Sequence, residues 1–471
     1  MNTTNIVQKV WNLCNVLRGD GVSYNEYISE LTYPLFLKIA KETKTEKLLP
    51  KGYRWDDLVS YKGVNLLGWY QEMLTHLGSE AKDDNVKKIY AFPTTVFSHS
   101  ENLKVVIDGI DNINWHSLSR DGIGDIYEGL LAKNSEDSRS GAGQYFTPRS
   151  LVDAIIEIIK PTVGEVIQDP ASGTGGFLIS ADKYIRDKCN VSAYKKSPPY
   201  YEGIEIEKGT FRLCLMNTFL HGMDAKIILG DALTVDAKKL NKADVIVANP
   251  PFGSKSGSVR DKRGDIKFPS SNKQLDFLQH IYSGLKNGGR AAVVLPDNVL
   301  FEDNIGRKIR EDLMHKCNLH TILRLPTGIF YAQGVKTNVL FFTKGAVKQD
   351  KDQTQNTWVY DMRANMPQFG KRTPFTFDYF DDFIKAYSDD PYGTSKRTDT
   401  GEEGRFRCFS REFIAERGDS LDISWLKDES NGSHEDLPEP DELAASAIAE
   451  LEGAVGDLNA ILELLPREET A

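Results

Sequence analysis

Four adjacent residues, Asn249-Pro250-Pro251-Phe252, have groups suited to holding a planar amine. Proline has no backbone N–H, so the two prolines stiffen the backbone and leave carbonyl oxygens free to accept hydrogen bonds. The Asn249 side-chain oxygen is a second acceptor, and Phe252 offers a ring on which a base can stack. Two such acceptors favour a tetrahedral nitrogen whose lone pair faces an electrophile. Taken alone, the same residues also fit a tight turn that closes a strand.

A second motif, DPASGTGGF over residues 169–177, places an acid before a glycine-rich turn. Glycine has no Cβ, so the backbone can approach a ligand closely. The segment has no Walker A lysine, and Leu178 stands where the dinucleotide motif has its last glycine, so phosphate binding is not indicated. This combination suits a cationic nucleoside without phosphates, such as S-adenosylmethionine; a structural turn is the alternative. The candidate cofactor-binding residues here are Asp169, Ser172, Gly173, Thr174 and Gly175.

Two further acids lie at the ends of predicted strands, Glu205 in YYEGIEI and Asp231 in KIILGDA. A carboxylate at the second strand end can accept both hydroxyl hydrogens of a ribose. Asp231 is placed to accept from an adenine amino group of the cofactor. Glu207 competes for the ribose, and we prefer Glu205 because it lies nearer the strand end. Each acid alone fits an exposed strand end equally well, but their order along the chain favours a nucleoside site followed by an amine site.

The elements that must position these motifs are short apolar segments that alternate with helical ones after about residue 165. Strands that alternate with helices predict right-handed βαβ units and a parallel sheet. We therefore expect an α/β fold with one doubly wound domain, in which ligands bind beyond the carboxyl ends of the strands. The seven predicted strands cover residues 165–170, 200–206, 226–232, 244–250, 290–296, 319–325 and 337–343.

The segments on either side of this domain differ from it in pattern. Ile6, Val10, Leu13 and Leu17 recur at helical spacing, and the residues before about 135 read as mostly helical. A polar segment over 134–143 predicts a linker or mobile loop, and residues 345–427 receive no structural prediction. We expect a helical domain over residues 1–140, the doubly wound domain over 141–427, and an acidic linker with a C-terminal helix over 428–471.

The negative charge is concentrated in the last part of the chain. The 471 residues carry a net charge of −10, but residues 428–471 hold thirteen acidic residues and one basic residue, which leaves about +2 for the rest. From Ala444 to Leu465, apolar residues repeat at spacings of four and three, which is a heptad pattern. This helix fits either packing on its own domain or a coiled-coil-like contact with another chain. The overall charge therefore does not exclude a nucleic-acid substrate.

Other features limit the class of protein. No stretch approaches the ~20 apolar residues of a membrane helix, and the N-terminus lacks a secretory signal pattern. The five cysteines are scattered without CxxC pairs, so neither disulfides nor a metal site is indicated. We expect a cytoplasmic protein.

The order GQYFTPR (143–149), DPASGTGGF, GDAL and NPPF resembles the DNA adenine-N6 methyltransferases. More narrowly, nearly the whole chain resembles the modification (M) subunit of type I restriction-modification systems. The resemblance implies a helical N-terminal domain, a Rossmann-like methyltransferase domain that uses S-adenosylmethionine, and a C-terminal helix that packs on the specificity (S) subunit. It also implies double-stranded DNA as substrate, a flipped-out target adenine, a restriction (R) subunit as a further partner, and two M subunits in each complex.

The resemblance also implies roles for single residues. Asp169, Gly173 and Gly175 would shape the floor of the cofactor pocket, with Glu205 at the ribose and Asp231 at the cofactor adenine. Asn249 and the Pro250 carbonyl would hold the target amine, next to Pro251, and Phe252 would stack on the base. The GQYFTPR segment adds four cofactor-binding residues, the last three at the methionine part: Gln144, Tyr145, Phe146 and Thr147.

Two other interpretations stay open at this point. A protein glutamine or ribosomal N-methyltransferase also acts on a planar nitrogen, although such enzymes usually carry Tyr where Phe252 stands and lack the GQYFTPR segment. A cofactor-binding scaffold without catalysis is disfavoured by the intact Asn249–Phe252 motif. The basic loop after Phe252, which extends to Lys273, fits either DNA phosphate contact or a solvated charged loop.

Overall fold

A computed structural model describes residues 3–18, 22, 24–91, 93–113, 115, 129–130, 147–253, 263–330, 335–346, 351–367, 369 and 373–426. The chain divides into two compact units. The first unit holds Met1–Ala142 together with Gly173–Gly175 and Glu205–Leu229, and the second holds the rest. The predicted acidic linker and C-terminal helix over 428–471 lie outside the described residues, as does the predicted linker over 134–143.

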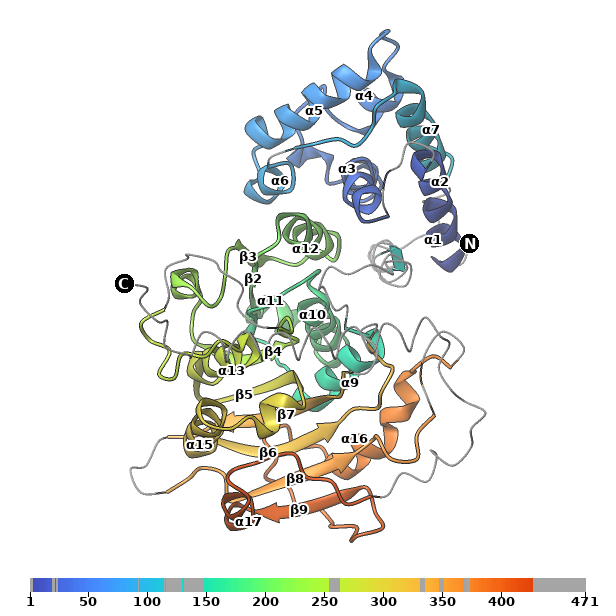
Figure 1. The fold of residues 1–471 in the computed structure, drawn as a ribbon. Helices are drawn as coiled ribbons and strands as arrows, with labels where there is room; N and C mark the ends of the chain where they lie inside the picture. The colour runs from blue at the N-terminus through green and yellow to red at the C-terminus, as the bar shows by residue number, and fades with distance from the viewer. Residues whose placement is uncertain are drawn as a thin grey trace, which may run out of the picture. The chain divides into compact units, whose positions relative to one another are not determined.

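The first unit is mostly helical, as the apolar spacing predicted. Helix α3 (Tyr24–Glu42) contacts several other helices of the unit, and its apolar residues Leu31, Leu35 and Leu37 are buried. Figure 1 draws α1 to α7 of this unit in blue to teal, and α12 and β3 in green. The bounds are α1 Thr3–Asn12, α2 Cys14–Arg18, η1 Glu46–Leu48, α4 Trp55–Ser60, α5 Leu66–Glu80, α6 Asp84–Ile89, α7 Ser100–Asp111, α12 Lys208–Leu220 and β3 Ala225–Leu229.

The strands form one nine-stranded sheet in the order β3-β2-β1-β4-β5-β7-β6-β8-β9. Strand β1 pairs in parallel with β2 and β4, and β4 pairs in parallel with β5. Each of the seven predicted strands is present. The bounds are β1 Val166–Asp169, β2 Tyr200–Glu205, β4 Ala243–Ala248, β5 Leu285–Pro296, β6 Cys317–Arg324, β7 Thr337–Lys344, β8 Asn356–Asp361 and β9 Phe406–Ser410.

The expectation of a parallel sheet is wrong at β7. This strand runs antiparallel to both of its neighbours, β5 and β6. Parallel neighbours need a long crossover, usually a helix, and the described residues between β6 and β7 contain none. Strands β8 and β9 are additional, and both lie in the segment 345–427, which received no structural prediction.

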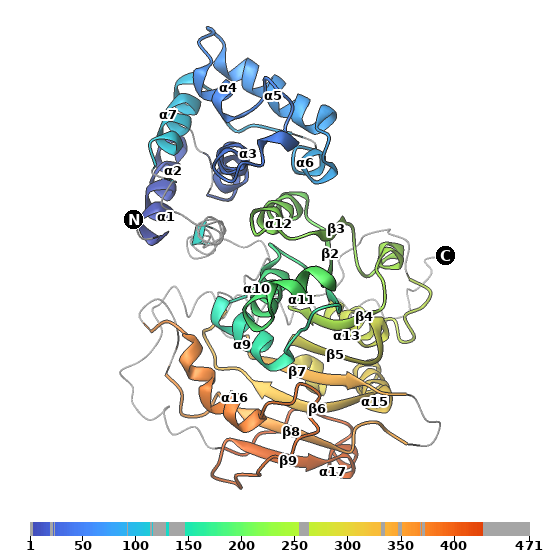
Figure 2. The same ribbon diagram turned by 180° about the vertical axis from the view of Figure 1, so that it is seen from behind.

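Helices cover both faces of the sheet in the second unit. Helices α13 (Lys273–Gly284) and α15 (Ile305–Lys316) share an apolar core with β4 to β7, whereas α9 (Arg149–Ile159), α10 (Gly176–Lys188) and α16 (Asp381–Tyr387) lie on the other face (Figure 2). This two-sided cover is the doubly wound arrangement that the sequence predicted. The remaining elements are α11 Val191–Lys196, η2 Val235–Lys239, α14 Asn298–Phe301, η3 Phe377–Phe380 and α17 Arg411–Glu416.

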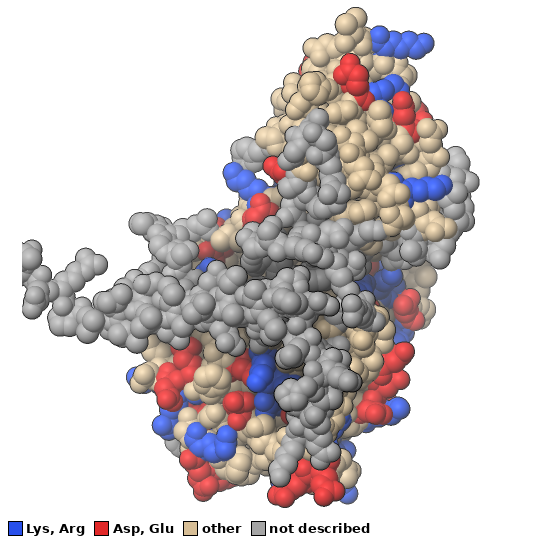
Figure 3. Space-filling view, turned by 45° about the vertical axis from the view of Figure 1, so that its right-hand side comes forward, with Lys and Arg blue, Asp and Glu red and all other residues tan. Residues whose placement is uncertain are grey.

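The surface charges agree with a body that is close to neutral. On the face drawn in Figure 3, Lys and Arg side chains alternate with Asp and Glu side chains over the described surface. No described helix has both the length and the apolar character that a membrane crossing requires.

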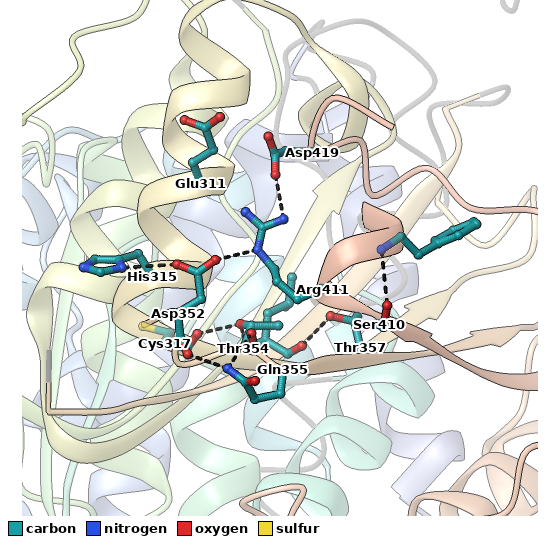
Figure 4. Close-up of polar contacts among 12 residues, drawn as sticks. Glu311, His315, Cys317, Asp352, Thr354, Gln355, Thr357, Ser410, Arg411 and Asp419 are labelled. Carbon is teal, nitrogen blue, oxygen red and sulfur yellow. Dashed lines mark hydrogen bonds and ion pairs between the residues drawn. The ribbon is translucent and has the colours of Figure 1, made fainter. Parts of the chain in front are cut away.

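A cluster of charged residues fastens α17 to α15 and to the segment before β8 (Figure 4). Arg411 donates from Nε to the Asp352 carboxylate, 2.7 Å away, and pairs with Asp419, also at 2.7 Å. Asp352 also lies 3.2 Å from the His315 ring, and Asp419 accepts from Arg307 at 3.1 Å. The carboxylates in this charged cluster therefore each have cationic or imidazole partners.

Candidate active site

Parallel pairing brings the ends of β1 and β4 to one edge of the sheet. Both strands consist mostly of buried residues, and a polar residue stands at or directly after the end of each. Asp169, which is 1% exposed, ends β1, and Asn249 follows the last residue of β4. The carboxyl edge of a doubly wound sheet is where such folds bind ligands, so the acid and the amide that the sequence singled out lie where a site is expected.

The Asn249 amide is held in one orientation by a residue far away in sequence. Its Nδ2 donates to the Thr147 hydroxyl at 3.0 Å, across 102 positions. Its Oδ1 is buried and has no hydrogen-bond partner among the described residues. A buried acceptor without a partner costs about 1–3 kcal/mol. Such an atom marks a place where a ligand can supply the missing donor.

The loop after Asn249 is fixed on both sides of Phe252. The Pro251 carbonyl accepts from Gln274 Nε2 at 3.2 Å, and Gln274 is 2% exposed at the start of α13. Gly253 has φ +107°, a conformation that other residues rarely adopt. Phe252 is half-buried, and the buried Phe330 lies edge-on to its ring, with centroids 6.5 Å apart. Phe252 is thus a half-buried aromatic residue directly after the Asn249 loop, with a second aromatic ring at its edge.

The beginning of the glycine-rich turn is fastened to β2. Both the backbone N–H and the hydroxyl of Ser172 donate to the Ile204 carbonyl, at 3.0 and 3.1 Å. The Asp169 carboxylate accepts from the backbone N–H of Ala171 at 3.0 Å. These bonds keep the turn close to the end of β1.

The turn continues in the first unit as the glycine loop, Gly173–Gly175. Gly173 and Gly175 have φ values of +53° and +84°, so both need the conformational freedom of glycine. The Gly173 N–H donates to Glu205 Oε2 at 2.9 Å, and the Thr174 carbonyl accepts from Asn217 Nδ2 at 3.0 Å. The predicted ribose acid therefore also shapes the glycine loop.

The two competing acids, Glu205 and Glu207, have different roles in the structure. The exposed Glu207 is the N-cap of α12 and accepts from the backbone N–H groups of Gly209 and Thr210. Glu205 is 7% exposed, and burial raises the pKa of its carboxyl, while backbone donors at Glu207 and Gly173 oppose that shift. Only Glu205 combines burial with a contact to the glycine loop.

Asp231 lies in a turn stabilised by local hydrogen bonds. Its carboxylate accepts from the Leu233 N–H at 2.9 Å, and its carbonyl accepts from the Thr234 hydroxyl at 2.8 Å. Arg263 donates to the next carbonyl, that of Ala232, at 3.0 Å, and also pairs with Asp265. Arg263 is the first described residue of the basic loop after the undescribed residues 254–262, so this part of the loop is fastened to the turn that carries Asp231.

Several predicted residues lie outside the described part of the chain. These are Gln144, Tyr145 and Phe146, and also residues 254–262 of the basic loop. The sequence analysis in turn missed two residues that hold the site's backbone, Asn217 and Gln274, and it included Arg263 only as part of the basic loop. Asn217 offered a signal, because it interrupts the apolar helix segment LCLMNTFL. Gln274 offered none, since polar residues near a loop are common.

Comparisons with known proteins give one consistent result. Residues 118–429 match the model of a family described as N-6 DNA Methylase. The type I restriction enzyme EcoKI methylase subunit of Escherichia coli (strain K12) is 47% identical over 517 residues, which cover 100% of this chain and 97% of that protein. A crystal structure of the EcoKI M protein matches with a TM-score of 0.56 and 44% identity, over 99% of this chain and 97% of that one. A chain from a type I R-M system matches with a TM-score of 0.71 and 26% identity, over 98% of both chains.

Proposed function

This chain belongs to the N-6 DNA methylases and, within them, to the methylase subunits of type I restriction enzymes, and we propose that it transfers a methyl group from S-adenosylmethionine to the N6 of a flipped-out adenine in double-stranded DNA. The activity as an adenine-specific DNA methyltransferase follows from the family. We further propose the use of S-adenosylmethionine, the roles of single residues and the identity of the partner subunits. A glutamine or ribosomal N-methyltransferase is not favoured by these relatives.

The orientation of Asn249 is the observation that carries the proposed mechanism. Thr147 holds the amide nitrogen, so Oδ1 is the atom left for a hydrogen of the target amine. The Pro250 carbonyl is the second acceptor, in a loop that Gln274 fixes through Pro251. Holding both amine hydrogens directs the nitrogen lone pair away from the two acceptors and toward the methyl donor. No covalent intermediate with the protein is needed.

Stacking on Phe252 would hold the adenine after it leaves the duplex. Flipping a base costs a few kcal/mol, and stacking on an aromatic ring contributes roughly 1–3 kcal/mol per base. The half-buried position of Phe252, with Phe330 at its edge, supports this role.

The glycine loop and the strand-end acids fit a sulfonium nucleoside. The loop brings backbone rather than side chains to the ligand, and Glu205, Asp169 and Asp231 supply carboxylates instead of phosphate-binding cations. Bound S-adenosylmethionine would supply an electrophilic methyl group. Glu205 would accept from the ribose hydroxyls and Asp231 from the adenine amine. The predicted contacts of Gln144, Tyr145 and Phe146 complete this proposal.

The wider assembly is also part of the proposal. The relatives are subunits of type I restriction enzymes. We propose that residues 428–471 contact a specificity subunit, which selects the DNA site, in a complex with two methylase subunits and a restriction subunit. Deleting residues 438–471 should then abolish co-purification with the specificity subunit while cofactor binding is retained. Co-purification that survives the deletion would place the contact elsewhere.

The decisive experiment tests Asn249 in the assembled complex. We expect Asn249→Ala to abolish transfer of labelled methyl groups to unmethylated DNA, with S-adenosylmethionine affinity close to wild type. Glu207→Gln, which changes a helix cap, serves as the control. Transfer at the wild-type rate by Asn249→Ala would contradict the mechanism, and label that enters protein rather than DNA would contradict the proposed substrate.

A further inference from the structure

Helix α12 begins three residues after Glu205 and is packed within the helical unit. It contacts α3 and α6 of that unit. Nine of its thirteen residues are buried, so it is surrounded nearly all the way round. Any group that α12 contacts beyond α3 and α6 is therefore linked to the N-terminal helices through this helix.

Aromatic and cationic side chains contribute to the packing of α12 on α3. The ring centroids of Phe36 and Phe219 lie 4.9 Å apart, at a tilt of 48°. The Arg212 guanidinium lies over the Tyr33 ring, 4.6 Å from its centroid, and donates to the Tyr33 hydroxyl. Tyr33 in turn accepts at its carbonyl from the hydroxyl of Tyr90. These aromatic and cationic contacts fix α12 along its length.

One residue of α12 reaches from this packing to the glycine loop. Asn217 is 0% exposed, and its Nδ2 donates to the Thr174 carbonyl at 3.0 Å. Thr174 lies between the two glycines with positive φ, so a displaced Thr174 carbonyl would move both of them. On the other side the loop is held only through Gly173, by Glu205, among the hydrogen bonds described within this unit.

We propose that Asn217 is a positioning residue of the cofactor site, through which α12 and the helical unit set the shape of the glycine loop. This inference rests on the proposed use of S-adenosylmethionine. Asn217 does not touch the reacting atoms. Its effect should therefore appear in cofactor binding and not in the chemical step, and changes in α3 should reach the cofactor through it.

The matched control lies next to it in the same helix. Thr218 is 3% exposed, and its hydroxyl donates to the carbonyls of Cys214 and Leu215, inside α12 itself. Thr218→Val therefore removes a buried donor at the same depth without touching the loop. Asn217→Asp keeps the shape but removes the donor, and Asn217→Ala avoids a buried charge.

The first experiment measures S-adenosylmethionine affinity by calorimetry on the full complex. We expect both Asn217 variants to raise the Kd about tenfold, the size expected when one buried hydrogen bond is lost. Thr218→Val should leave the Kd unchanged. At saturating cofactor, kcat and the KM for DNA should match wild type, and thermal unfolding identifies any variant that fails to fold. An unchanged Kd in Asn217→Ala, or an equal loss in Thr218→Val, overturns the proposal.

A second experiment tests the connection to α3. Phe36→Leu should weaken cofactor binding in the wild-type background and have less effect in Asn217→Ala, since the route to the loop is then already broken. An equal loss of cofactor affinity in both backgrounds would show that α3 does not act on the cofactor site through Asn217. A wild-type complex that binds no S-adenosylmethionine would instead contradict the proposed cofactor, so the two failures are distinguishable.

Discussion

Two polar regions of the second unit are built in opposite ways. In the charged cluster, Asp352 and Asp419 are paired with Arg411 and with a further basic side chain each. At the end of β4, a hydrogen bond to Thr147 fixes the Asn249 amide, but its buried oxygen has no partner among the described residues. The first region pairs each carboxylate with basic side chains, and these pairs stabilise the fold. The second keeps an acceptor free and oriented, which stability alone would not favour.

Asn249 should show the largest effect, and on activity only. Asn249→Ala should lower kcat for DNA methylation by about 100-fold or more, as for loss of one preorganised polar group at a reacting centre. It should leave the free energy of unfolding nearly unchanged, because the loss of the hydrogen bond to Thr147 is offset by the removal of a buried oxygen without a described partner. Denaturant titration beside a methylation assay measures both. A clear loss of stability without a loss of kcat would show that Asn249 stabilises the fold and does not act in catalysis.

A change at Arg411 should lower stability without lowering activity. Arg411→Met leaves the buried Asp419 without this partner, and the free energy of unfolding should fall by about 1–3 kcal/mol. Methylation by the folded enzyme should not change. Arg417→Met in the same segment is the control, because that exposed guanidinium bonds only to a carbonyl, that of Asp422, among the described hydrogen bonds. Equal losses in the two variants would show that the charged cluster adds no special stability.

Thr147 should affect catalysis through the orientation of the Asn249 amide. Thr147→Val removes the acceptor that holds Asn249 Nδ2, and kcat should fall about tenfold, since a misoriented catalytic group loses part of its effect. Ser150→Ala removes a nearby hydroxyl that bonds to the Phe375 carbonyl, at 2.8 Å, and serves as the control. Single-turnover rates separate this effect from product release. A kcat that stays at the wild-type value would show that Asn249 is oriented without Thr147.

The sequence predicted the strands and the order of their polar ends, because alternating apolar segments and terminal acids are local signals. It did not predict the Thr147–Asn249 contact, which joins residues 102 positions apart. The antiparallel β7 was also missed, because pairing direction depends on the connection and not on the strand itself. Asn217 was visible only as a polar residue in an apolar helix, and the sequence does not say what it bonds to.

The smallest effect should come from the protonation of Glu205. Burial raises the pKa of this carboxyl. As the pH falls through the raised pKa, the group binds a proton and loses acceptor capacity, so cofactor affinity should fall at a higher pH than for an exposed glutamate. The neutral form suits the buried site better, so this carboxyl's own contribution to stability is greatest at low pH and declines as the pH rises through that pKa. Stability and cofactor affinity therefore move in opposite directions with pH. Glu205→Gln should abolish the acidic loss of affinity and Glu207→Gln should not; persistence of that loss in Glu205→Gln would assign it to another group.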